Sequence, residues 1–179
     1  NVRLINNELE LVTNRLTYDR NKEIAYFYNH GTMYDNANVL DANYGEYNTV
    51  SELTSFYGKV DLVNPDYELT SDTLLYNTTS KMAVIVSPAI ITSQENMIDT
   101  HHAFFYTEQG RMILLDQSKL IGENRTRVMS ADSIYYDNNA QFASAFGNIC
   151  IDDYENGMKL SGEYLYFNDA NDSVVVTDN

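Results

Sequence analysis

A short phrase that ends in an aromatic residue and a polar turn former occurs six times along the 179-residue chain. Counted on the aromatic position, successive copies are 29, 29, 30, 30 and 31 residues apart. Repetition at a nearly fixed period of this length is typical of proteins that stack one supersecondary unit on the next. The six copies are "TNRLTYDR" (13–20), "ANYGEYNT" (42–49), "SDTLLYNT" (71–78), "HHAFFYTE" (101–108), "ADSIYYDN" (131–138) and "GEYLYFND" (162–169).

Each copy has the pattern of the closing strand of a two-strand unit. After the turn that follows the aromatic residue, apolar and polar side chains alternate with a period of two, which indicates a half-buried strand. A second turn then precedes the returning strand. We therefore predict an all-β fold of about six two-strand units, with open sheet edges at both ends of the array.

The returning strand changes phase once in each unit. In five of the six units an apolar residue stands seven positions before the aromatic residue, and in five one stands two positions before it. These two positions fall on opposite faces of an uninterrupted strand. Such a switch requires a bulge or a corner. We predict a bend, where the strand passes from one sheet to another, at the polar residue of the switch: Asn14, Asn43, Asp72, His102, Asp132 and Glu163.

The alternation also predicts which side chains face the interior between the sheets. A tyrosine on such a strand can serve as core, or as a ligand contact with its hydroxyl group at the rim. Because side-chain direction alternates, a register slip of one residue would turn a strand inside out. The predicted interior residues are Phe27, Phe56, Ile85, Leu115, Ala145 and Ile149, accompanied by Tyr76, Tyr106 and Tyr136.

Charge and composition restrict the partners. A net charge of -15 disfavours nucleic acid, whose phosphates require a basic surface, and also anionic lipid headgroups. Adjacent residues on a strand point to opposite faces, so His101 and His102 do not form a metal-ligand pair. Cys150 is the single cysteine, which excludes an internal disulfide and a cysteine metal cluster. We expect neither a metal nor a cofactor.

Three phrases near the C-terminal end resemble those of a known family. They are "ADSIYYD" (131–137), "GNI" (147–149) and "DYENG" (153–157). In combination they resemble the repeated phrases of the OstA/LptA family of lipopolysaccharide-transport proteins. The similarity is sharpest between Met129 and Asn168, and through the repeat it extends in weaker form over nearly the whole chain.

The resemblance implies a single OstA-like β-jelly roll over residues 1–179, also described as a slotted or taco-like fold, or a piece of a longer repeat protein. It implies a periplasmic location in a Gram-negative cell envelope and a passive, non-enzymatic role in outer-membrane biogenesis. Lipopolysaccharide acyl chains would lie in the apolar groove between the sheets. The implied protein partners are further copies of the chain and jelly-roll domains of the LptC and LptD types, joined edge to edge.

Two other functions fit the same repeats. A structural or adhesive β-solenoid would have a fully packed interior and no ligand. A carbohydrate-acting enzyme would require clustered carboxylates in one cleft. The carboxylates of Asp152 and Asp153 lie in the segment "DDYENG", where turn geometry already explains their presence.

Overall fold

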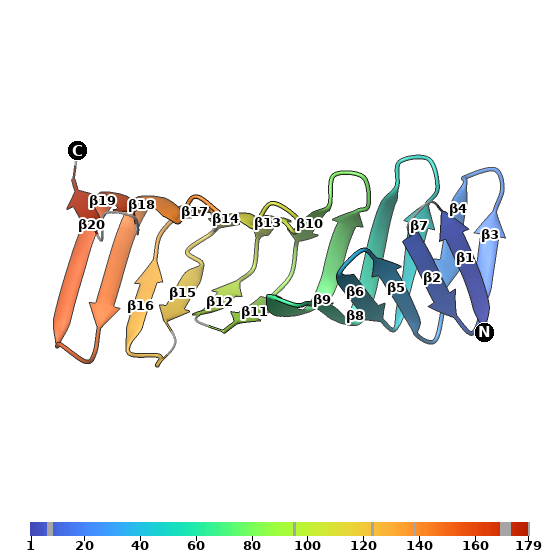
Figure 1. Ribbon diagram of the computed structural model, residues 1–179, viewed down its shortest axis with the longest axis horizontal. Helices are drawn as coiled ribbons and strands as arrows, with labels where there is room; N and C mark the ends of the chain where they lie inside the picture. The colour runs from blue at the N-terminus through green and yellow to red at the C-terminus, as the bar shows by residue number, and fades with distance from the viewer. Residues whose placement is uncertain (7–8, 95, 123, 138, 169–172, 179) are drawn as a thin grey trace.

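The computed structural model describes residues 1–6, 9–94, 96–122, 124–137, 139–168 and 173–178. Within these ranges the chain forms twenty strands and no helix, so they contain no membrane-spanning helix. The strands stack along the long axis of an elongated molecule, with the two termini at opposite ends (Figure 1). The predicted all-β class is confirmed.

The strands are short except where one strand continues through a bend. Their bounds are β1 Val2–Asn6, β2 Leu9–Thr13, β3 Leu16–Asp19, β4 Ile24–Phe27, β5 Gly31–Asp35, β6 Asn38–Ala42, β7 Tyr44–Asn48, β8 Leu53–Asn64, β9 Tyr67–Asn77, β10 Met82–Ile85, β11 Ala89–Ser93, β12 Asn96–Thr100, β13 Ala103–Tyr106, β14 Arg111–Leu115, β15 Lys119–Gly122, β16 Arg127–Ser130, β17 Ser133–Asp137, β18 Phe142–Asp153, β19 Met158–Asn168 and β20 Ser173–Thr177.

Antiparallel pairing arranges these strands in two layers. Layer 1 follows the order β1, β2, β5, β6, β8, β9, β11, β12, β15, β16, β18, β19. Layer 2 follows the order β3, β4, β7, β8, β9, β10, β13, β14, β17, β18, β19, β20. Four long strands, β8, β9, β18 and β19, therefore run through both layers.

The chain passes between the layers at corners along one side of the molecule. Between β8 and β9 the register shifts where Gly58 and Lys59, with φ of 71° and 58°, stand opposite the single residue Asp72. One extra residue on one strand makes a β-bulge, which bends that strand. The same shift places Gly147 and Asn148 opposite Glu163. At the other predicted bends one strand ends and the next begins, so the bends are confirmed at Asn14, Asn43, His102 and Asp132 as well.

The opposite ends of the strands carry the turns, which we call the tips of each layer. In layer 2 the side chain of Asn48 accepts hydrogen bonds from the backbone N–H groups of Val50 and Ser51, both at 2.9 Å. Such local bonds are the reason that Asn and Asp favour turns. Asp19 and Asn77 repeat the arrangement one unit earlier and one unit later. The turn formers in the repeated phrase therefore shape these tips.

The apolar faces of the two layers meet in one continuous core. Leu11, Leu40 and Leu69 come from layer 1, and Phe27 and Phe56 from layer 2, and all five are fully buried. Phe27 and Phe56 lie on strands separated by β7, with ring centroids 6.1 Å apart. The interior between the layers is thus either filled by side chains or open to a ligand.

Candidate functional site

A cavity of about 410 Å³ lies between the two layers in the part of the molecule built by β9 to β18. This volume falls in the range of about 300–1,000 Å³ that is usual for small-molecule sites. Its residues come from both layers and from the tips. They are Asp66, Tyr67, Ile91, Ser93, Gln94, Asn96, Ile98, Phe105, Thr107, Glu108, Gly110, Met112, Leu114, Leu120, Ile134, Tyr136, Asn139 and Ala143.

The interior of the cavity is apolar and its rim is polar. Ile91, Ile98 and Leu120 line it from layer 1, while Phe105 and Met112 face them from layer 2. The strand residues therefore supply the apolar walls, because their inward positions repeat every second residue. The charged side chains of Asp66 and Glu108 and the amides of Gln94 and Asn139 belong to the tip turns, and the remaining amide, Asn96, begins β12 beside them. Such a site suits a ligand with an apolar chain and a polar end.

The interior toward the N-terminal end is filled with side chains. Phe27, Met33, Phe56, Leu62 and Leu74 are all fully buried there. Tyr67 marks the transition, because its ring packs edge-on against Phe105 with 4.6 Å between the centroids. The molecule thus combines a packed half with a hollow part in the same two-layered fold.

The buried Tyr76 and the half-buried Tyr67 stand at the tips beside this transition. Burial raises the pKa of Tyr67, and burial together with the nearby Asp35 carboxylate raises the pKa of Tyr76. Both phenols therefore remain protonated at neutral pH and act as hydrogen-bond donors. Tyr76 donates to Asp35 Oδ2 at 2.8 Å, and Tyr67 donates to Asn38 Oδ1 at 3.3 Å.

Most predicted interior residues do face the interior. Their side chains are buried between the layers, as the alternation predicts, but most lie in the packed core and not along the cavity. Tyr136 is the one predicted residue among the cavity-lining set, and it also packs against the core. The inward-facing residues are Phe27, Phe56, Ile85, Tyr76, Ala145 and Ile149, together with Tyr136.

Two predicted interior residues, Tyr106 and Leu115, lie on the outer face, and that part of the prediction was wrong. In β13 the buried positions are Ala103 and Phe105, so Tyr106 points outward. In β14 the buried positions are Met112 and Leu114, which turns Leu115 outward in the same way. The physical reason is a phase error of one residue, which exchanges the two faces of a strand.

The sequence reasoning therefore missed Phe105, Met112 and Leu114, which line the cavity. A signal for the correct phase was present. Seven residues before Tyr106 stands Asp99, whereas the other units carry an apolar residue at that offset. Counting from Phe105 places Ile98 there instead, and Ile98 is buried and lines the cavity.

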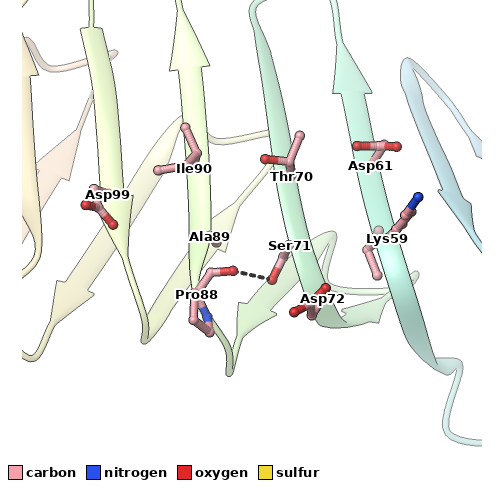
Figure 2. A pocket seen from close by; sticks show the side chains of 10 residues that line it. Lys59, Asp61, Thr70, Ser71, Asp72, Pro88, Ala89, Ile90 and Asp99 are labelled. Carbon is pink, nitrogen blue, oxygen red and sulfur yellow. Dashed lines mark hydrogen bonds between the residues drawn. The ribbon is translucent and has the colours of Figure 1, made fainter.

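A second hollow of about 410 Å³ lies on the outer face of layer 1, beside the corners. Figure 2 shows Asp61, Thr70, Ile90 and Asp99 in a row across four neighbouring strands. Ser71 donates a hydrogen bond to the carbonyl group of Pro88 at 3.1 Å below that row (Figure 2). Within the described ranges no three His, Cys, Asp or Glu side chains are grouped so that they could hold a metal ion.

Comparisons with known proteins agree with the repeated motifs. A model of the family "OstA-like protein" matches residues 1–72, at the opposite end of the chain from the sharpest motif similarity. A search of curated proteins finds no match. Among solved structures, one match is LptH, the LptA-homologous periplasmic component of the lipopolysaccharide transport device of Pseudomonas aeruginosa.

That match has 13% sequence identity, covers 87% of this chain and 82% of LptH, and has a TM-score of 0.31. At this TM-score, no residue of the chain is equated with a residue of LptH. The family model bears on residues 1–72, less than half of the chain, and it confirms the resemblance that the motifs predict. Over those residues the sequence is similar to OstA-like proteins.

Proposed function

We propose that the chain is a periplasmic protein that binds lipopolysaccharide and forms part of a bridge to the outer membrane. The observation that carries the proposal is the cavity between the layers, with its apolar walls and its polar rim. The acyl chains would enter the cavity and the polar part of the lipid would stay at the rim. The OstA-like family match over residues 1–72 supports the proposal.

The energetics favour acyl chains over the lipid headgroup as the part that is held. Each buried methylene contributes about 0.8 kcal/mol. The described residues that line the cavity include no lysine or arginine, while Asp66 and Glu108 place carboxylates at the rim. Lipid phosphates would therefore remain in solvent, or divalent cations would bridge them to carboxylates.

The sheet edges support assembly into a bridge. In the described residues β1 and β3 each pair along one edge only, at the N-terminal end, and so does β20 at the C-terminal end. Unpaired edges can accept a strand from another chain. We propose that residues 1–179 form one jelly-roll domain of about six two-strand units. Its edges would join another copy, or jelly-roll domains of the LptC and LptD types.

The alternatives differ in what they require of the interior. A structural or adhesive solenoid requires a packed interior, and the fully buried N-terminal core would suit that role. The cavity beside it distinguishes the transport proposal from this alternative. A carbohydrate-acting enzyme is not supported, since OstA-like proteins act in transport and are not enzymes.

Photo-crosslinking from two neighbouring phenylalanines tests the proposal. A photoreactive phenylalanine analogue is placed at Phe105, which lines the cavity, or at Phe104, whose side chain lies on the outer face of the same strand. Purified protein is then mixed with lipopolysaccharide and irradiated. We expect a crosslink from position 105 and none from position 104. Absence of a crosslink at 105 in a folded protein would favour the packed structural alternative.

A further inference from the structure

A buried polar cluster joins the tips of the two layers beside the cavity. Asn38, which begins β6 in layer 1, is its centre and is 2% exposed. Its amide nitrogen lies 3.2 Å from Tyr76 Oη and 3.3 Å from Thr107 Oγ1, both in layer 2. Its amide oxygen accepts hydrogen bonds from Asn64 at 2.9 Å and from the Tyr67 hydroxyl group at 3.3 Å. The cluster therefore uses both polar atoms of the Asn38 amide.

An ion pair continues the cluster on the side away from the cavity. Lys81 Nζ lies 2.5 Å from Asp35 Oδ1, and the two side chains are only 16% and 1% exposed. Asp35 Oδ2 also accepts a hydrogen bond from the Tyr76 hydroxyl group. Because the partners come from the tips of different layers, these bonds hold the two tips together.

Tyr67 and Thr107 belong both to this cluster and to the lining of the cavity. The Tyr67 ring also packs edge-on against the cavity residue Phe105. On the far side of this boundary the interior residues Leu74 and Ile85 are fully buried. The cavity thus ends at Tyr67 in a wall that has hydrogen-bonded polar groups at the tips and packed side chains in the core.

We propose that Tyr67, held by the Asn38 cluster, is the closed end of the acyl-binding cavity and limits the length of the chain that it accepts. This inference rests on the proposed function, because it assumes that the cavity takes up acyl chains. Displacing Tyr67 would break its hydrogen bond to the buried amide oxygen of Asn38, which would then keep only the hydrogen bond from Asn64. It would also separate the Tyr67 ring from Phe105. Both losses cost free energy, so the wall resists a longer chain.

A series of saturated fatty acids of increasing length, each below its critical micelle concentration, tests the wall by calorimetric titration. For the unaltered protein we expect the affinity to rise about fourfold per added methylene and then to level off once the chain reaches Tyr67. In Tyr67→Ala the break should move to a longer chain. Tyr67→Phe is the matched control, which keeps the ring and removes only the hydroxyl group that Asn38 holds, so its break should move less than that of Tyr67→Ala.

Each outcome of this series decides a different point. If affinity rises without a break, or if the break is the same in Tyr67→Ala, Tyr67 does not limit the chain length, but the proposal that the cavity binds acyl chains is retained. If no fatty acid of any length binds to the folded protein, both the proposed acyl binding and the proposed role of Tyr67 are refuted.

A second measurement uses the unaltered protein and so does not depend on the folding of a variant. A fatty acid with a diazirine at its methyl end is bound and irradiated, and the labelled residues are mapped by mass spectrometry. We expect labels on cavity residues such as Tyr67 and Phe105. Labelling of Phe56, which lies beyond the wall in the packed core, would overturn the proposal.

Discussion

Lys81 Nζ lies 2.5 Å from Asp35 Oδ1, so an ion pair connects the tips of the two layers beside the Asn38 cluster. Asp35 is 1% exposed and would lose its charged partner in Lys81→Met. An unpaired buried charge typically costs about 3–5 kcal/mol, and we expect this loss in the free energy of unfolding measured with urea.

The double variant Asp35→Asn/Lys81→Met removes both charges, and it should recover a large part of that loss. The exposed lysine Lys22 provides the control, since Lys22→Met should change stability by no more than about 0.5 kcal/mol. Equal effects at positions 22 and 81 would mean that the ion pair contributes nothing.

Two adjacent leucines test the register of β14. Leu114 is 1% exposed and lines the cavity, whereas Leu115 is half-buried on the outer face. We expect Leu114→Ala to lower the free energy of unfolding by about 2–5 kcal/mol. Leu115→Ala should cost about 1 kcal/mol or less. Chemical denaturation of the two variants in parallel decides the register, and the reverse order of the two losses would refute it.

Gly147 occupies a corner where a side chain has no room. Its φ is 74°, and a Cβ atom there would approach Asp132 Oδ2 to 2.4 Å. Gly157 has a similar φ of 63° but faces open space. Gly157→Ala should therefore cost only the backbone strain of about 1–2 kcal/mol, while Gly147→Ala should add about 1–3 kcal/mol of overpacking. Thermal unfolding distinguishes the two, and equal midpoints would mean that Asp132 moves aside freely.

Asp153 makes the stability of the fold depend on pH in the acidic range. Hydrogen bonds from the Asn156 side chain and backbone N–H group, with a smaller contribution from Arg127, lower the pKa of Asp153 to about 2. Its unfolded value is about 3.9, so the carboxylate stabilises the fold above that pH and loses this effect as pH falls toward 2.

Asn156→Ala removes the side-chain hydrogen bond to Asp153 and should bring the pKa of Asp153 closer to its unfolded value. We expect lower stability at neutral pH and a shallower decline between about pH 4 and pH 2 in urea titrations. The exposed residue Asn124 supplies a matched Asn→Ala control, which should keep the slope of the original protein. An unchanged slope in Asn156→Ala would mean that this hydrogen bond does not set the pKa.

The repeated phrase predicted the class of the fold and the position of its bends, because both depend on local chemistry. Alternation defines the strands, and the polar residue at each phase switch defines the corner. The two-residue bulges on the opposite strand, at Gly58 and Lys59 and at Gly147 and Asn148, were not predicted. Both residues of each pair have a left-handed backbone, which is a consequence of how the two strands pair and not of the local pattern.

The one slip of register has a specific cause. When the units are aligned with Phe105 at the aromatic position, Tyr106 stands where other units carry the turn-forming residue, such as Asn77 or Asp137. Aligning on tyrosine therefore selected the wrong residue. With Phe105 in the aromatic position, the spacings become 29, 29, 29, 31 and 31. The pattern of intervals is then simpler than the one read from tyrosine alone.

The cavity itself could not be predicted from alternation. The same inward positions carry leucine, isoleucine or phenylalanine in the packed half and in the hollow part. Whether they touch depends on the separation of the layers, which long-range contacts such as that between Tyr67 and Phe105 determine. A binary pattern of apolar and polar residues contains no measure of that separation.

The change in spacing from 29 to 31 residues arises at the tips of layer 1. β5 ends at Asp35 and β6 begins at Asn38, whereas β18 ends at Asp153 and β19 begins at Met158, so the later turn is two residues longer. The inward positions on both sides of the turn keep their spacing from the corners. Variation in length is thus absorbed at the margin that, in the proposed function, would meet the head of a lipid. That margin can differ in length from unit to unit while the strands behind it keep their inward-facing positions.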